Sequence, residues 1–216
     1  MKRALMLGML IMAVLGVSAQ DIKLPRPATR LGVDLLDAVQ DRQASKAFVK
    51  KTVPPSDLAT LLWAGLGPRG PDAVTSATKA NRTISFSGDN PYINIYVLTD
   101  KGTWKYLPDT GSLQTLGITD ARAAVSRASI SDAAFMLLFT VDNGLTPSFL
   151  KANPATFQLM SHATAGFSAQ NIGLAASALK MATVVQYTMN PSEAVKAANL
   201  GKDEVPLFIM QGGYTN

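Results

Sequence analysis

Two basic side chains, Arg42 and Lys46, lie four residues apart in the segment Arg42-Gln43-Ala44-Ser45-Lys46-Ala47-Phe48. The planar guanidinium of arginine and the compact ammonium of lysine both suit a phosphate monoester. Phe48 is a residue type that anchors such a segment in a core. Taken alone, this spacing also fits a solvated pair of surface cations, and that simpler interpretation is favoured unless other segments support a phosphate site.

Other chemistry is sparse. The 216 residues include no cysteine, and His162 is the only histidine, which excludes thiolate zinc sites, cysteine nucleophiles and metal sites with several histidines. The acidic residues show no paired-carboxylate pattern, and the glycine-rich stretch 65–70 fits neither a phosphate loop nor a dinucleotide fingerprint. We therefore expect no metal site and a surface or packing role for His162. No basic run is interleaved with aromatics, so nothing supports nucleic-acid binding.

The first residues have the layout of a secretory signal peptide. Lys2 and Arg3 precede an apolar run over 4–17, and Val17-Ser18-Ala19 offers small residues for cleavage. The run is short for a membrane span, so an uncleaved anchor is the less favoured alternative. We expect residues 1–19 to be removed and residues 20–216 to form one domain, exported to the periplasm or the extracellular space without stable membrane insertion. Loss of two cations lowers the formal charge from +5 to +3.

The hydrophobic pattern predicts a mixed α+β domain with one central sheet and helices on its faces. Helices are expected over 33–42, 57–66, 120–129, 154–181 and from Pro191 onward, and strands over 93–98, 103–107, 112–116, 134–141, 182–187 and 205–210. Strand 134–141 is expected at the centre. Ser56 should cap one helix, and Asn190 with Glu193 should form a capping box. Segment 67–82 is expected to be a long functional loop.

Four segments, in order, resemble the FMN-dependent nitroreductase family. They are Arg42–Phe48, Asp57–Gly65 (DLATLLWAG), Arg82–Val97 (beginning RTISFSGDN) and Ala165–Ala176 (AGFSAQNIGLAA), and the closing segment 205–214 (VPLFIMQGGY) also agrees. The third segment and the following meander are similar to the subgroup that includes peptide thiazoline/oxazoline dehydrogenases. The resemblance covers essentially the whole of residues 20–216.

The resemblance implies an α+β nitroreductase-like fold, with a mostly antiparallel sheet of four or five strands flanked by helices. It also implies an intertwined homodimer with FMN in the interface pockets. Such a protein would transfer hydride or electrons between a donor such as NAD(P)H and a small organic acceptor, nitroaromatic or quinone-like. The flavin carries this chemistry, which agrees with the lack of an acid/base constellation in the sequence.

The resemblance also implies a set of flavin-binding residues. Arg42 and Lys46 would hold the FMN phosphate, while Gln43 and Ala44 would touch the phosphate or the ribityl chain. The loop along the flavin ring would contribute Ser85, Ser87, Asp89 and the neighbouring Asn90. The backbone of Val184, Val185 and Gln186 would reach the pyrimidine edge and N5.

Two substitutions leave an alternative function open. Ala44 stands where the family often has a serine hydroxyl, and Asp89 stands where many members have an asparagine. An ionised carboxylate cannot donate a hydrogen bond to the ring, although Asn90 could substitute. The alternative is a catalytically degenerate nitroreductase-fold protein that acts in binding or as a scaffold. A third interpretation is an exported α+β domain with chance similarity to these motifs.

Overall fold

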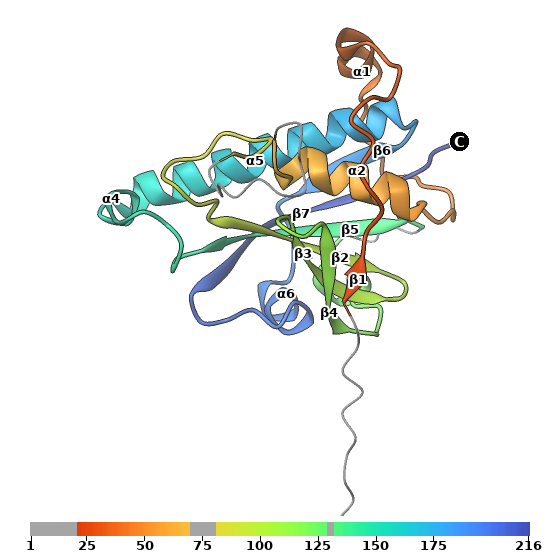
Figure 1. Ribbon diagram of the computed structural model, residues 1–216. Coiled ribbons are helices and arrows are strands. Elements are labelled where there is room, and N and C mark those ends of the chain that lie inside the picture. Colours follow the sequence, from red (N-terminus) through yellow and green to blue (C-terminus); the bar gives the residue numbers. More distant parts are fainter. Residues whose placement is uncertain (1–20, 70–80, 129–131) are drawn as a thin grey trace, which may run out of the picture.

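The computed structural model describes residues 21–69, 81–128 and 132–216 (Figure 1). The expected signal peptide and most of the predicted loop 67–82 lie outside these residues. The helices are α1 (Leu35–Asp41), α2 (Pro55–Leu66), α3 (Arg122–Val125), α4 (Ser148–Lys151), α5 (Pro154–Ala178) and α6 (Pro191–Ala197). The strands are β1 (Ile22–Lys23), β2 (Ile93–Thr99), β3 (Gly102–Leu107), β4 (Ser112–Gly117), β5 (Phe135–Asp142), β6 (Ala182–Gln186) and β7 (Glu204–Gly213).

The strands form one sheet in the order β1-β4-β3-β2-β5-β7-β6, and every neighbouring pair is antiparallel. The predicted meander β2–β3–β4 and the central position of β5 are confirmed. The expected four or five strands are too few, because the sheet has seven. One addition is β1, whose two residues are too short to show any periodicity. The α+β prediction holds for the described chain.

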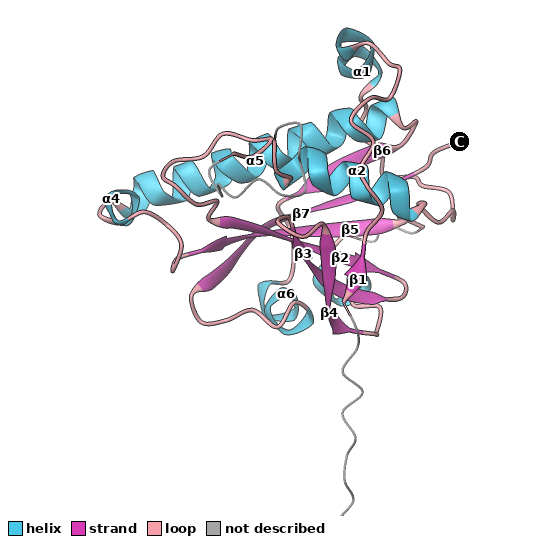
Figure 2. Cartoon of the chain, viewed as in Figure 1, coloured by secondary structure: helices cyan, strands magenta, loops and turns pink. Residues whose placement is uncertain are grey.

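Helices cover both faces of the sheet (Figure 2). Helices α2 and α5 lie on one face, over a core that includes Ile95, Val97 and Phe139. The shorter helices α3 and α6 lie on the other face, where Leu98, Met136 and Ile209 are buried. Alternate residues of β2 and β5 therefore enter opposite cores, which explains their continuously apolar sequences.

Helices α2 and α5 approach each other closely at Gly65. A Cβ at this position would lie 2.5 Å from Cδ1 of Ile172, so only glycine fits without a shift. Two glycines of α5, Gly166 and Gly173, are further candidates for close packing on a neighbour because they lack a side chain. A Cβ on Gly166 would meet nothing within 4 Å, and one on Gly173 would make only ordinary contacts. The tightest approach of α2 and α5 is therefore at Gly65 of α2, while Gly166 faces open space and Gly173 has neighbours at van der Waals distance.

The helix ends differ in part from the sequence predictions. Ser56 does not cap α2, because Pro54 is the N-cap residue and Pro55 occupies the first turn, where its missing N–H costs nothing. Asn153 caps α5, accepting hydrogen bonds from the backbone N–H groups of Ala155 and Thr156. Within the described residues, no helix is both long enough and apolar enough to cross a bilayer.

The capping box of α6 does not form. The helix begins at Pro191 as predicted, but Asn190 makes no side-chain cap and instead accepts a hydrogen bond from Ser192. Glu193 pairs with Lys196 at 2.7 Å. The helix predicted over 120–129 is also too long, because α3 ends at Val125 and the chain then forms a bridge from Ser126 to Met189. Residue 129 lies outside the described residues.

Candidate functional site

Arg42 is placed at the end of α1 and against the last turns of α5. Its backbone N–H closes α1 by donating to Ala38 O at 3.1 Å. Its side chain lies beside Gly173, where a Cβ would come 3.7 Å from Arg42 Cδ. This half-buried guanidinium has no hydrogen bond or ion pair with other described residues. A cation that has no partner among the described residues is available for an external anion.

Phe48 anchors the segment that carries the two cations, as predicted. Its ring is buried in a small cluster with Ala133 and Ala182, on which Val184 also packs. The next residue, Val49, donates its backbone N–H to Tyr214 O at 2.9 Å. Between these fixed points Gln43, Ala44 and Lys46 are exposed. The segment is therefore fixed at both ends and open to solvent in the middle.

Strand β6 places the predicted residues 184–186 at the edge of the sheet. It is the outermost strand beside β7, so one side of its backbone has no strand partner. The side chain of Gln186 is buried and accepts a hydrogen bond from Gln211 Nε2 at 3.0 Å. Val184 packs with Phe48, whereas Val185 is 50% exposed. Of residues 184–186, the outer backbone and the side chain of Val185 are thus the parts most open to a ligand at this edge.

Thr183, which no motif of the sequence marks, faces the same side of the sheet as Arg42. A Cβ on Gly173 would lie 3.5 Å from Thr183 Oγ1. Alternation along a strand puts Thr183 and Val185 on the α5 side and Val184 and Gln186 on the other side. This alternation of side chains along a strand can be seen in the sequence, and it could have shown that Thr183 and Val185 lie on a different face of the sheet from Val184 and Gln186.

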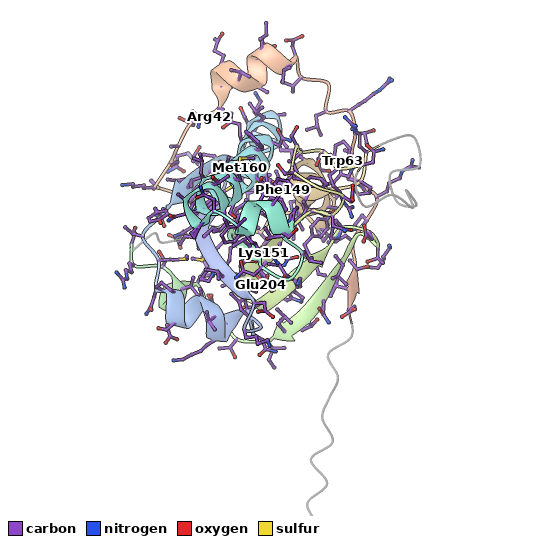
Figure 3. The ribbon with its side chains drawn as sticks, turned by 90° about the vertical axis from the view of Figure 1, so that its left-hand side faces the viewer. Arg42, Trp63, Phe149, Lys151, Met160 and Glu204 are labelled. Atoms are coloured by element: carbon purple, nitrogen blue, oxygen red, sulfur yellow. The ribbon has the colours of Figure 1, made fainter. Side chains whose placement is uncertain are left out.

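The loop carrying Ser85, Ser87, Asp89 and Asn90 lies elsewhere on the molecule. At its start Thr83 donates its hydroxyl to Trp63 O at 3.0 Å and accepts a hydrogen bond from Asn171 at 3.0 Å. Figure 3 shows Trp63 and Arg42 on opposite sides of the chain. The loop then runs along α5 toward α4 (Figure 1), where a Cβ on Gly88 would lie 2.6 Å from Pro147. One chain therefore does not bring this loop beside Arg42.

A polar cavity of about 270 Å³ opens beside the start of this loop. Ser85 lines it together with Arg69 and Arg82. Arg82 is buried and pairs with Asp109. Ser87 is half-buried, and Ser85, Asp89 and Asn90 are exposed.

His162 lies on α5 and takes the packing role that the sequence predicted. Its Nδ1 is 2.8 Å from Gln158 O, and its ring centroid is 5.9 Å from that of Tyr187. A carbonyl can only accept, so Nδ1 carries the proton in this hydrogen bond. No group of three metal-ligating side chains exists within the described parts of the chain.

Two features can therefore meet a ligand at the α1 end of α5. One is the cation Arg42, with the exposed Lys46 nearby in sequence, and the other is the open edge of β6 with the exposed Val185. A phosphate suits the first feature, and a flat ring with hydrogen-bonding edges suits the second. The residues present thus fit a flavin mononucleotide.

A model of the nitroreductase family matches residues 39–214. The chain belongs to the nitroreductase family. Family membership supports oxidoreductase chemistry as the general class of activity. No curated protein sequence matches the chain.

Solved structures show the nitroreductase fold as well. A structure from Ralstonia eutropha JMP134, described as a nitroreductase, is 24% identical with a TM-score of 0.80, covering 94% of this chain and 92% of its own. The NADPH:FMN oxidoreductase of Vibrio harveyi, complexed with NAD+, is 17% identical with a TM-score of 0.57, covering 84% and 69%. The E. coli microcin synthetase complex McbBCD is 16% identical with a TM-score of 0.63, covering 88% and 75%. The expected fold class is confirmed.

Proposed function

We propose that the protein is an FMN-dependent oxidoreductase of the nitroreductase type. It would transfer hydride or electrons from a donor such as NAD(P)H to a small organic acceptor, nitroaromatic or quinone-like. The observation that supports this most directly is the guanidinium of Arg42. The Arg42 side chain passes Gly173, next to Thr183 of the edge strand β6, and its guanidinium has no hydrogen bond or ion pair with other described residues.

Each part of this edge has a separate task in the proposal. Arg42 and Lys46 hold the phosphate, and Gln43 and Ala44 contact the phosphate or the ribityl chain. The outer backbone of Val184, Val185 and Gln186 orients the ring. When bound, FMN supplies the redox chemistry, so the chain needs no general base of its own.

We propose that two copies form a homodimer and that the partner completes each site. Several large apolar side chains are exposed on α1, among them Leu35 at 65%, Leu36 at 74% and Val39 at 49%. Phe167 of α5 is 49% exposed. Exposed apolar groups of this kind favour an interface. A dimer also offers a route for the partner's loop Ser85–Asn90 to reach the Arg42 end of the site.

We propose export on the basis of the signal-like residues 1–19. Nicotinamide donors are scarce outside the cytoplasm, so the natural reaction there could be dehydrogenation of a substrate with oxygen as acceptor. Sequencing the N-terminus of the protein from a periplasmic fraction tests this. A protein that retains Met1 and stays with the cytoplasmic fraction would contradict export.

Within the family, we propose the subgroup of peptide thiazoline/oxazoline dehydrogenases. The basis is the segment Arg82–Val97 with the β2–β4 meander. Oxidation of a model thiazoline peptide by the FMN-loaded protein tests the assignment. Turnover of quinones or nitroaromatics without any turnover of the peptide would place the chain outside this subgroup.

One observation favours a second function. Ala44 is exposed but has no hydroxyl, and Asp89 is an exposed carboxylate on the predicted ring loop. These positions favour a nitroreductase-fold binding or scaffold protein with weak FMN binding or none. The two functions differ in whether the purified protein binds FMN and catalyses the reduction of a substrate.

The test is a titration of FMN fluorescence with the purified protein, followed by NADH-dependent reduction of a quinone. We expect saturable binding and turnover. Arg42→Ala removes charge-assisted hydrogen bonds, each contributing roughly 1.5–3 kcal/mol, and should weaken FMN binding roughly 10- to 100-fold. Arg26→Ala removes an exposed arginine elsewhere and should change neither quantity. Absence of FMN binding in the unmodified protein would favour the scaffold function.

A further inference from the structure

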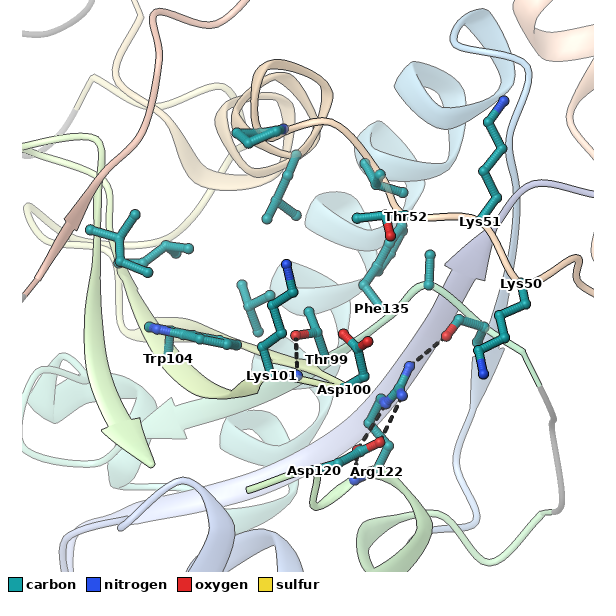
Figure 4. Close-up of a pocket in the computed structure, with 18 of the residues that line it drawn as sticks. Lys50, Lys51, Thr52, Thr99, Asp100, Lys101, Trp104, Asp120, Arg122 and Phe135 are labelled. Atoms are coloured by element: carbon teal, nitrogen blue, oxygen red, sulfur yellow. Dashed lines mark hydrogen bonds and ion pairs between the residues drawn. The ribbon is translucent and has the colours of Figure 1, made fainter. Parts of the chain in front are cut away.

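A second, larger cavity is lined by residues other than those of the proposed flavin site. It has a volume of about 580 Å³, which is within the usual range for small-molecule sites. It opens between the sheet and the first turn of α2, where the β2–β3 turn meets the start of β5 (Figure 4). None of the residues assigned above to FMN lines it.

The apolar part of this cavity has two opposed walls. The sheet contributes Val97, Trp104 and Phe135, and α2 contributes Pro55 and Leu58. Figure 4 shows the indole of Trp104 lying along the strands of the sheet wall. Trp104 is only 8% exposed, so its ring is held in place by the core. A space between a sheet and a helix with an indole on one wall suits a flat aromatic ring.

The other end of the cavity is charged. Four basic and three acidic side chains line it: Lys50, Lys51, Lys101, Arg122, Asp100, Asp120 and Asp132. Arg122 holds Asp120 through two hydrogen bonds of 2.9 and 2.7 Å, and it also donates to Ala133 O. The charges of Asp120 and Arg122 cancel each other. The other charged residues that line the cavity are three lysines and two aspartates, so positive charge is in excess.

The lysines differ in how they are held. Nζ of Lys51 lies 3.9 Å from the centroid of the Tyr214 ring. The ammonium of Lys101 has no hydrogen bond or ion pair with other described residues, and Figure 4 shows its side chain beside Trp104. A free ammonium next to an aromatic wall can meet the charged head of a ligand whose ring is buried.

We propose that this cavity binds a flat aromatic organic anion, a carboxylate or a sulfonate. The ring lies between Trp104 and Leu58, and the acidic head lies at Lys101. The apolar walls provide the affinity for the ring, and the excess of lysine selects a negative head. The site is independent of FMN, so the proposal does not rest on the proposed oxidoreductase activity.

The probe for the test is 8-anilinonaphthalene-1-sulfonate, titrated into the full-length protein while its fluorescence is followed. We expect saturable binding of one probe per chain. Displacement by 2-naphthoate, but not by FMN or by the cation 1-naphthylmethylamine, is also expected. Competition by FMN, or displacement by the cation as strong as that by 2-naphthoate, would overturn the proposal.

Two variants locate the bound probe. Lys101→Gln should weaken binding roughly two- to fivefold, the range for one exposed ion pair, whereas Lys202→Gln removes a distant exposed lysine and should not.

Leu58→Trp should fill the space between the walls and abolish binding. Leu145→Trp, which adds the same ring at an exposed position, should leave binding unchanged. Circular dichroism confirms that each variant is folded. Equal affinities for Lys101→Gln and Lys202→Gln, or unchanged binding to folded Leu58→Trp, would contradict the proposed site.

Discussion

The side chain of Arg42 packs against the backbone of Gly173, so the cation of the proposed phosphate site is positioned by a helix that follows it by more than a hundred residues. A Cβ on Gly173 would lie 3.7 Å from Arg42 Cδ and 3.5 Å from Thr183 Oγ1. Space for one methyl group therefore exists, but space for a longer side chain does not.

Substitutions of Gly173 test this arrangement. Gly173→Ala should raise the free energy of unfolding by roughly 0.5–1 kcal/mol, because alanine favours a helix interior over glycine. FMN binding should stay unchanged in this variant. Gly173→Leu should displace Arg42 and weaken FMN binding. Urea unfolding and FMN titration measure the two effects. Strong FMN binding by a folded Gly173→Leu protein would show that Arg42 does not hold the phosphate from this position.

Gly65→Ala should destabilise the protein. The new Cβ would lie 2.5 Å from Cδ1 of Ile172, whose side chain is completely buried. Overpacking of this kind costs roughly 1–3 kcal/mol. The double variant Gly65→Ala/Ile172→Val lacks Cδ1, the nearer of two clashing atoms, but keeps Cγ1 at 2.8 Å, so it should recover only part of the loss in a double-mutant cycle. Additive effects of the two substitutions would argue against close contact between α2 and α5 at this point.

Lys180→Gly should stabilise the turn between α5 and β6. Lys180 has a φ of 58°, a left-handed conformation that glycine adopts without steric cost. The expected gain is roughly 0.5–1 kcal/mol, reduced by loss of the exposed contact with Asp41 at 3.4 Å. Lys180→Ala also loses this contact but keeps the strained conformation, so it should be less stable than Lys180→Gly in thermal unfolding. Equal midpoints for the two variants would contradict a steric cost at this position.

The Asp120–Arg122 pair should make stability depend on pH in the acidic range. Hydrogen bonds from Arg122 hold the pKa of Asp120 below its usual value of 3.8. Because the folded-state pKa is lowered, the contribution is complete above that usual value. It is lost as the pH falls through the lower pKa of the folded state. Asp120 is 39% exposed, so the contribution is at most about 1 kcal/mol.

Asp120→Asn provides the matching measurement. The stability difference from the unmodified protein should be largest near neutral pH and should shrink toward about pH 2. Asp132→Asn removes a carboxylate that has no ion pair among the described residues, and it serves as the control for the loss of one negative charge in this region. A difference for Asp120→Asn that stays constant down to about pH 2 would contradict the lowered pKa.

The sequence identified those parts of the fold that depend on local periodicity. Strand β5 is a short, mostly apolar run and lies inside the sheet between β2 and β7, and α5 follows a long helical pattern. The anchoring role of Phe48 was also predictable, because a large aromatic ring in a polar segment gains free energy by leaving water for the core.

The rest of the fold and of the candidate site depends on contacts between segments that are far apart in the sequence. Ser56 and Asn190 have the residue types of helix caps, but α2 begins one residue before Ser56, and Asn190 accepts a hydrogen bond from the Ser192 side chain without capping α6. The order of motifs placed Arg42 and the loop Ser85–Asn90 in one proposed site. Chain order carries no information on distance, and the loop lies on the other side of the molecule from Arg42. The amphipathic cavity could not be predicted from the sequence either, since its walls come from segments far apart in the sequence.

The position of β7 determines when the sheet can be completed. This strand spans Glu204–Gly213 and lies inside the sheet, between β5 and β6, although it is the last strand in the chain. Until it is synthesised, β5 has an unpaired edge of apolar residues and β6 has no neighbour. Folding during translation therefore cannot finish before these late residues leave the ribosome. A chain with this topology can close its sheet only after synthesis of nearly its whole length.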